Sequence, residues 1–311
     1  MKPVVHPADR GDAPGRAAGG PDTPARATAG THTASQRGPL RRYLETRGLV
    51  GGHTAPHMHT RLFTDDGVRL AATHVPGPPS APGAVLLLHG FAANRRKPSY
   101  ARLADGLARS TGVLALDLRG HGGSAGACTW GDGEVEDVRA GVRWLRAYGY
   151  GRVALLGLSM GGTAALHAAS LDVEVDAVAT VSAPAYFHDP PTTAPLQRLH
   201  VLWNSRVRRA GLRALVGVSL AAPTGWRTPR HPVEMAGEIE VPLLVVHGED
   251  DDYFPMTDAN DLVAAAAGPA TLWQRPAGFG HAEDGLDPTV VDLLTEAMAH
   301  VLHTGRFPPA P

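Results

Sequence analysis

Short, uninterrupted apolar runs recur along this chain and constrain its fold more than any other feature. Ala84–Leu88 and Leu243–Val246 contain no polar residue. Runs of this length suit strands that are covered on both faces, as in a parallel sheet. Asp65-Asp66-Gly67, a turn signal, separates the first two predicted strands. The predicted strands span residues 58–64, 68–75, 84–88, 113–116, 153–156, 175–181, 243–246 and 270–273.

Between most of these runs, apolar residues recur with helical spacing. Tyr100, Leu103, Ala104, Leu107 and Ala108 lie on one face of a helix with 3.6 residues per turn. The predicted helices span 100–109, 135–148, 259–267 and 290–302. Alternating strands and helices indicate an α/β fold with a mostly parallel, doubly wound sheet.

The N-terminal segment has a different composition. Its first 40 residues contain six Pro, six Gly and eight Ala, with hardly a large apolar residue. Such a segment cannot bury enough surface to offset its ordering entropy. We predict a disordered extension over residues 1–45, a loose tail or a partner-binding arm, followed by one domain over 46–311. No apolar stretch of a secretory signal follows Lys2, which with the lack of paired cysteines favours a cytoplasmic protein.

Composition excludes several classes of function. The 29 basic and 30 acidic residues give a net charge of −1, which argues against nucleic acid as the partner. Cys128 is the only cysteine and excludes an internal disulfide or a cysteine-cluster metal site. No run of 18 apolar residues exists, so no membrane span is expected.

No cofactor or metal is predicted either. Gly120 to Gly126 is Gly-rich but lacks the Lys of a phosphate-binding loop. His53, His57 and His59 lack the spacing and the accompanying ligands of a zinc site. We interpret these three histidines as part of a solvated linker.

The most specific motif is Gly157-Leu158-Ser159-Met160-Gly161, which fits Gly-x-Ser-x-Gly. It follows an apolar run that ends at Leu156 and precedes a helix-compatible segment, as a nucleophile elbow requires. The tight turn needs small residues two positions before and after the serine, and it holds the serine in a strained conformation. Ser159 is therefore the predicted nucleophile.

A serine hydroxyl needs a base within hydrogen-bond reach and an acid that orients the base. His281 follows the last apolar run and is the predicted base. The loop after Leu243–Val246 contains Asp250, Asp251 and Asp252 as possible acids.

These motifs resemble those of serine esterases and lipases in the α/β-hydrolase superfamily, and the chain is similar to bacterial cinnamoyl-ester and monoacylglycerol hydrolases. The resemblance implies the chain order serine, acid, histidine. It also implies an acid three residues after the Gly of His-Gly and four before a Pro, which selects Asp251 over its two rivals. The matching motifs, within about residues 60 to 303, are His89-Gly90-Phe91, Asp117 to Ser124, Gly157 to Gly162, His247 to Asp251 and Gly280-His281.

The resemblance also implies an oxyanion hole made of two backbone N–H groups. One belongs to Met160, the residue after the nucleophile, and the other to Phe91 in the His-Gly-x loop. His89 and His121 are expected to shape loops near the site. Cys128 is expected to take no part, because the histidine base already serves Ser159.

A helical cap is expected after the sixth strand, over about residues 184–232. Pro195 to Leu220 is predicted to form one or two helices with a break at Gly211. Its leucines suit an apolar substrate pocket. The whole expected cap, residues 184–232, contains seven Arg and one acidic residue, Asp189. Its basic face is either simply solvated or attracts an anionic substrate.

The predicted function is cofactor-free cleavage of a small-molecule carboxylic ester through an acyl-enzyme, with Ser159, His281 and Asp251 as the triad. A thioesterase, an acyltransferase or a C–C bond hydrolase remains open, because the acyl-enzyme is common to these activities. A non-catalytic ligand receptor on the same scaffold is a third alternative. The oligomeric state is left open.

Overall fold

The computed structural model describes residues 52–171, 173–222 and 230–311. The predicted disordered extension, residues 1–45, and a part of the predicted cap, residues 223–229, lie outside these ranges.

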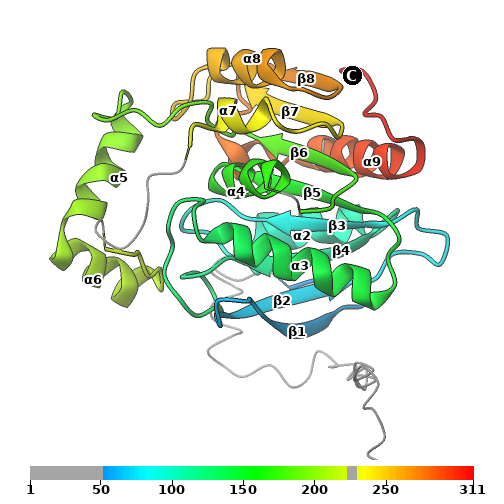
Figure 1. Ribbon diagram of the computed structural model, residues 1–311, viewed down its shortest axis with the longest axis horizontal. Coiled ribbons are helices and arrows are strands. Elements are labelled where there is room, and N and C mark those ends of the chain that lie inside the picture. Colours follow the sequence, from blue (N-terminus) through cyan, green and yellow to red (C-terminus); the bar gives the residue numbers. More distant parts are fainter. Residues whose placement is uncertain (1–51, 172, 223–229) are drawn as a thin grey trace, which may run out of the picture. The chain divides into compact units, whose positions relative to one another are not determined.

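Within the described residues, eight strands form one sheet in the order β1-β2-β4-β3-β5-β6-β7-β8 (Figure 1). The pairs β1–β2 and β2–β4 are antiparallel, and all other neighbouring pairs are parallel. The strands are β1 (Met58–Phe63), β2 (Arg69–Val75), β3 (Ala84–Leu88), β4 (Gly112–Asp117), β5 (Val153–Leu158), β6 (Ala177–Val181), β7 (Leu243–Gly248) and β8 (Ala270–Arg275).

Helices cover both faces of this sheet (Figure 1). The helices α3, α4, α7 and α8 pack on one face, and α2 and α9 pack on the other. The helices are α2 (Pro98–Leu107), α3 (Glu134–Tyr148), α4 (Met160–Ser170), α5 (Ala194–Asn204), α6 (Arg206–Val216), α7 (Pro232–Ala236), α8 (Met256–Ala265) and α9 (Pro288–Thr304), with a 3₁₀ helix η3 (Ala282–Gly285).

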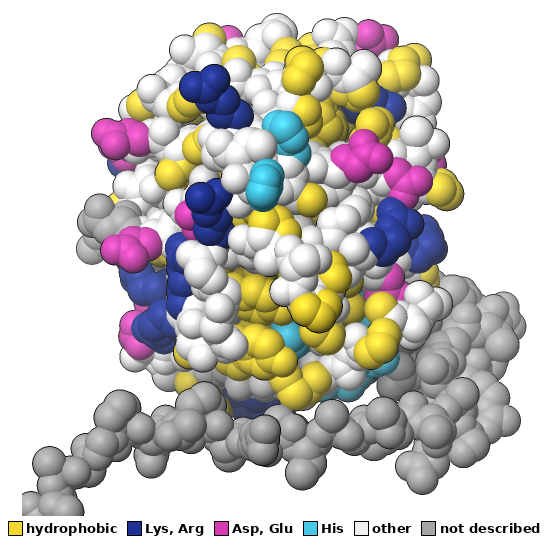
Figure 2. Space-filling view, turned by 90° about the vertical axis from the view of Figure 1, so that its right-hand side faces the viewer, with side chains coloured by type: hydrophobic (Ala, Val, Ile, Leu, Met, Phe, Trp, Pro, Cys, Tyr) yellow, Lys and Arg dark blue, Asp and Glu magenta, His cyan; other side chains and the backbone are white. Residues whose placement is uncertain are grey.

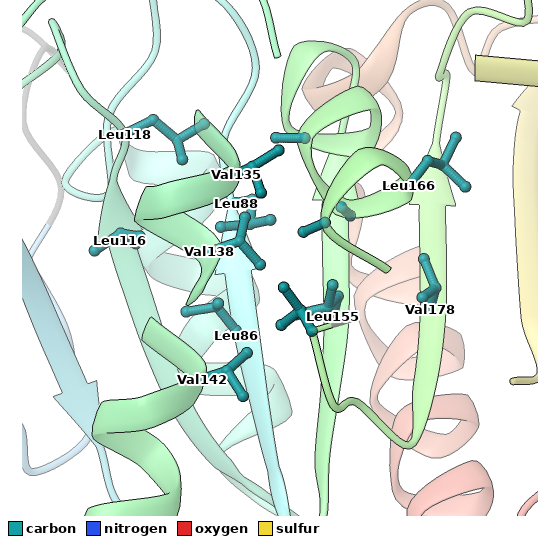
Figure 3. Packing of buried hydrophobic residues seen from close by; sticks show 14 of the residues in the cluster. Leu86, Leu88, Leu116, Leu118, Val135, Val138, Val142, Leu155, Leu166 and Val178 are labelled. Carbon is teal, nitrogen blue, oxygen red and sulfur yellow. The ribbon is translucent and has the colours of Figure 1, made fainter. Parts of the chain in front are cut away.

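The apolar runs form strands because both of their faces are covered. Along β3, Leu86 and Leu88 join the core under α3, while Val85 and Leu87 join the core under α2 and α9. This alternation follows from the two-residue repeat of a strand. Figure 3 shows Val138 of α3 against the leucines of β3. Each fully buried leucine contributes about 1.5 to 3 kcal/mol relative to an exposed one.

The predicted fold class is confirmed. All eight strands and the four helices predicted outside the cap are present, and their ends differ from the predictions by three residues or fewer. None of the helices in the described part of the chain is both long and apolar enough to cross a bilayer.

Helices α5 and α6 follow β6, where a cap was expected, but the predicted break at Gly211 is wrong. The break lies at Ser205, whose backbone is extended and whose side chain accepts a hydrogen bond from Arg208 N and caps α6. Gly211 lies inside α6, because a glycine within a helix costs only about 1 kcal/mol and does not end it. Ser205, a residue type that often caps the N-terminus of a helix, was the stronger signal for the position of the break.

Backbone hydrogen bonds and an aromatic contact are among the interactions that hold these helices to the rest of the domain. The segment after α6 forms backbone hydrogen bonds with the loop after β4: Cys128 N donates to Ser219 O at 2.8 Å, and Ala221 N donates to Cys128 O at 3.0 Å. In addition, the rings of Trp130 and Trp203 meet edge to face, with their centroids 5.7 Å apart.

The interpretation of the N-terminal histidines as a solvated linker is wrong for His53. Its Nδ1 lies 2.7 Å from Asp105 Oδ1 on α2, and only 3% of its side chain is exposed. Asp105 also accepts hydrogen bonds from the backbone and side chain of Thr54. His57 is exposed, as expected of a linker, whereas His59 lies in β1 and its Nδ1 is 3.0 Å from Thr73 Oγ1 of β2.

Candidate active site

Ser159 stands in the tight turn between β5 and α4, at the carboxyl edge of the parallel strands. Its φ of 50° and ψ of −117° are unfavourable for a residue with a side chain. The turn needs both glycines of the motif: a Cβ at Gly157 would lie 2.2 Å from Gly161 O, and one at Gly161 would lie 2.4 Å from Leu88 O. The Gly-x-Ser-x-Gly pattern therefore reflects a steric requirement of this turn.

Three side chains that are distant in sequence form a hydrogen-bonded line at this edge. Ser159 Oγ lies 3.0 Å from Nε2 of His281, a residue of the loop between β8 and η3. Nδ1 of His281 lies 2.9 and 2.8 Å from the two carboxylate oxygens of Asp251, which follows β7. The Asp251 side chain is fully buried, whereas 12% of the His281 side chain is exposed.

The surroundings keep Asp251 ionised and the imidazole fixed. Burial alone would raise the pKa of Asp251, but the hydrogen bond and charge of His281 outweigh burial, and the pKa lies below its ordinary value. Asp251 also accepts hydrogen bonds from the N–H groups of Tyr253 and Phe254. The Tyr253 ring stacks on the imidazole with centroids 4.2 Å apart.

The structure separates the three candidate acids. Asp250 turns away from the imidazole and accepts hydrogen bonds from Gly278 N at 2.7 Å and Gly280 N at 3.0 Å, which shapes the loop before His281. Asp252 is exposed and forms no hydrogen bond with His281. Of the three, Asp251 alone is bonded to the histidine.

Phe91 and Met160, the two expected oxyanion donors, both lie close to Ser159. Phe91 lines the cavity beside Ser159, and Met160 is the first residue of α4. Within the described residues, neither of their N–H groups donates a hydrogen bond. Both donors are therefore available to a developing oxyanion.

Two buried histidines shape the loop that contains Phe91. His121 Nε2 accepts a hydrogen bond from Ala92 N, and His89 Nδ1 donates to Gly90 O at 2.8 Å. Burial, assisted by the neighbouring His89, lowers the pKa of His121 to about 3. Burial likewise lowers the pKa of His89. Both rings are therefore neutral near pH 7 and act as fixed hydrogen-bonding groups.

A further pair of residues near this loop was missed by the sequence analysis. The Tyr100 hydroxyl accepts a hydrogen bond from Gly90 N at 2.8 Å and donates one to Glu283 Oε2 at 2.7 Å. Glu283 also forms an ion pair with Lys97. This network joins the Phe91 loop to η3, directly after His281. In the sequence, Tyr100 was one apolar position of a helix, and no motif marked its hydroxyl.

Ser159 opens into a cavity of about 410 Å³. Leucines of α5 and α6 form one wall, and aromatic rings form much of the rest. The only Lys, Arg, Asp or Glu side chains among its described lining residues are Glu283 and Asp284. The lining residues from the cap helices are Leu196, Leu199, Leu202, Leu212 and Val216. None of the cap arginines in the described ranges lines this cavity, so the described site offers no support for an anionic substrate.

Cys128 and the histidine cluster give no competing chemistry. Burial raises the pKa of the Cys128 thiol well above its ordinary value, and its Sγ lies 3.5 Å from Met160 Sδ. No group of three metal-ligating side chains occurs within residues 52–171, 173–222 and 230–311.

Comparison with known proteins identifies the family. A profile of the alpha/beta hydrolase fold matches residues 83–233. An uncharacterized protein of Mycobacterium tuberculosis (strain ATCC 25618 / H37Rv) is 31% identical over 236 residues, which cover 74% of this chain and 72% of that protein. The chain belongs to the α/β-hydrolase superfamily. The resemblance inferred from the motifs is thereby confirmed.

Solved structures agree with this α/β-hydrolase assignment. An esterase of Pyrococcus furiosus matches with a TM-score of 0.62 at 22% identity, over 81% of this chain and 96% of the esterase. An esterase of Rhodococcus sp. ECU1013 matches with a TM-score of 0.60 at 19% identity, over 79% of this chain and 99% of that one. At these identities the similarity establishes the fold.

Proposed function

We propose that this α/β-hydrolase is a serine hydrolase that cleaves carboxylic esters of small molecules. The observation that carries the proposal is the hydrogen-bonded line from Ser159 through His281 to Asp251, which ends at a largely apolar cavity. The esterase activity named for two proteins of the same fold supports the reaction class.

In the proposed mechanism, His281 Nε2 takes the proton of Ser159 Oγ as the oxygen attacks the ester carbonyl. The carbonyl oxygen becomes an oxyanion between the N–H groups of Phe91 and Met160. Asp251 holds the proton on Nδ1 of the imidazole, so that Nε2 is free to act as the base, and it stabilises the imidazolium that forms.

The tetrahedral intermediate then breaks its bond to the alcohol oxygen. His281 donates its Nε2 proton to that oxygen, and the acyl group remains on Ser159. A water molecule, deprotonated by His281, attacks the acyl-enzyme in the second half of the cycle. The acid leaves and Ser159 recovers its proton.

The apolar cavity supports an uncharged substrate. The leucines of α5 and α6 exclude water from one side of Ser159, which strengthens the electrostatic interactions at the reacting carbonyl. Glu283 and Asp284 at the cavity disfavour an anionic acyl or alcohol group through like-charge repulsion.

The direct test is turnover of a neutral ester series by the wild type and by Ser159→Ala. We expect Ser159→Ala to lose roughly three or more orders of magnitude in kcat with its fold intact. Ser110→Ala, a serine remote from the triad, is the matched control and should retain activity. Near-normal turnover by Ser159→Ala would overturn the proposal.

Three further measurements separate the alternatives. A panel of matched esters and thioesters distinguishes an esterase from a thioesterase, and an added acyl acceptor reveals an acyltransferase. A fluorophosphonate probe should label the wild type and Ser110→Ala but leave Ser159→Ala unlabelled. Folded wild-type protein that resists the probe would favour the ligand-receptor alternative.

A further inference from the structure

The two cap helices are strongly basic. Arg209 donates a hydrogen bond to Trp203 O. Helices α5 and α6 contain five Arg and no acidic residue. Within the described chain, the four that are exposed form no ion pair. These are Arg198, Arg206, Arg208 and Arg213. Elsewhere the charges are mixed: on the face shown in Figure 2, Lys and Arg side chains lie near Asp and Glu side chains.

Helix α6 also has two apolar stripes instead of one. Leu212 and Val216, four residues apart, line the cavity. On the other side of the helix, Val207, Gly211 and Leu215 repeat with the same four-residue spacing, and Ala210 and Ala214 extend this outer stripe. An amphipathic helix in a globular domain needs only the first of these stripes.

The outer stripe is the most exposed apolar surface in the described part of the chain. Leu215 is 88% exposed and Val207 is 81% exposed, the two highest values among its large apolar residues. Val201 of α5 and Val216 are 44% and 54% exposed. Val216 lines the cavity and belongs to the inner stripe of α6. Contiguous exposed apolar residues mark a contact surface.

Arginines flank this stripe on both sides. At 100° per residue, Arg206 and Arg213 fall along one edge of the outer stripe, and Arg208 falls along the other. A helix with an apolar stripe between basic edges has the pattern of helices that lie in the interface of a bilayer, where arginines meet lipid phosphates.

We propose that the outer face of α6, with Val201 and Arg198 of α5, docks on an anionic phospholipid surface. In this position Val207 and Leu215 enter the acyl-chain boundary while the arginines contact the headgroups. A second copy of the chain is disfavoured as the occupant, because two such faces would bring eight arginines together without an acidic partner. The proposal does not depend on the catalytic role of Ser159.

The test is co-sedimentation of the full chain with large unilamellar vesicles of phosphatidylcholine, with and without phosphatidylglycerol. We expect binding to the anionic vesicles only, and release when NaCl is raised from 50 to 500 mM. Ser159→Ala should bind as the wild type does, so failure of the proposed esterase function and failure of docking give different results.

Two pairs of matched variants assign the binding to this face. Arg206→Glu with Arg213→Glu should weaken vesicle binding by at least about 25-fold, since each arginine contributes about fivefold near an anionic surface. Arg61→Glu with Arg102→Glu changes the net charge equally on other surfaces and should have little effect.

The apolar contribution is tested in the same assay. Val207→Ser with Leu215→Ser should weaken binding without changing charge, whereas Phe63→Ser with Leu171→Ser removes exposed apolar side chains elsewhere and should not. Turnover of a soluble ester confirms that each variant is folded. The proposal is overturned if the wild type does not bind anionic vesicles, or if the cap variants and their controls lose binding equally.

Discussion

Replacing Tyr100 with Phe isolates one hydroxyl that links the Phe91 loop to the loop of His281. The hydroxyl is fully buried, and burial raises the pKa of Tyr100 well above its ordinary value, so it remains a hydrogen-bond donor at every working pH. Phenylalanine keeps the ring and its packing. The variant therefore removes the bonds to Gly90 N and Glu283 Oε2 without leaving a large cavity.

The expected cost follows from the two groups that lose a partner. The Gly90 N–H is buried and would be left without an acceptor, at a cost of about 1 to 3 kcal/mol. Glu283 keeps its ion pair with Lys97 and some contact with solvent, so its loss is about 1 kcal/mol or less. The free energy of unfolding should fall by about 1 to 4 kcal/mol in total.

Catalysis should also suffer, because Gly90 directly precedes the proposed donor Phe91. Loss of one oxyanion donor reduces kcat by about 10² to 10³, and a displaced donor should cost a part of this, about tenfold, with little change in KM. Urea unfolding and steady-state turnover of a neutral ester measure both effects. Tyr148→Phe, an exposed tyrosine on α3, is the control. If Tyr100→Phe unfolds at the wild-type urea concentration and keeps its kcat, the hydroxyl does not hold this loop.

Three other perturbations have defined outcomes. Asp251→Asn should lower kcat by roughly 10³ to 10⁴ because the imidazole loses its oriented tautomer, whereas Asp252→Asn should not; equal activity of the two variants in an ester assay would contradict the assignment of the acid. Gly211→Ala should raise the free energy of unfolding by up to about 1 kcal/mol, since a Cβ there meets no atom within 4 Å; a lower melting temperature would show that α6 is distorted. Burial lowers the pKa of His74 to about 4 in the folded chain. Between pH 6.5 and 4 the unfolded chain therefore binds one more proton than the folded chain. The free energy of unfolding should fall by about 1.4 kcal/mol for each unit by which the pH is lowered in this range. His74→Gln should flatten this slope in urea titrations, and an unchanged slope would exclude His74 as its source.

The sequence predicted the sheet and the turn that contains Ser159 because both depend on local signals. Continuous apolar runs form strands only where both faces are covered, and the two glycines around Ser159 are required by contacts of 2.2 and 2.4 Å that any side chain would make. The resemblance to serine esterases selected Asp251 among three neighbouring aspartates, and Asp251 is the residue hydrogen-bonded to His281. It could not reveal that Asp250 holds the same loop through Gly278 and Gly280, because those bonds join segments from different strands.

Other features depend on contacts that no local pattern encodes. Tyr100 has the spacing of a core residue, and its hydroxyl acquires a role only where the fold brings Gly90 and Glu283 to it. His53 lies in a polar segment that resembles a linker, yet Asp105 of α2 buries it. Along the chain, the partners of Tyr100 are 10 and 183 residues away from it, and the partner of His53 is 52 residues away.

The cap shows how one misplaced break changes a functional inference. In a single helix that ran to Gly211, the 3.6-residue repeat would determine on which side the arginines lie relative to the leucines that precede them. The break at Ser205 removes that relation, because α6 begins with its own direction. Leu212 then turns toward the cavity, and Arg206 and Arg213 remain outside it. The same arginines that in sequence suggested an anionic substrate thus belong to the outer surface, where we propose that they meet an anionic lipid surface.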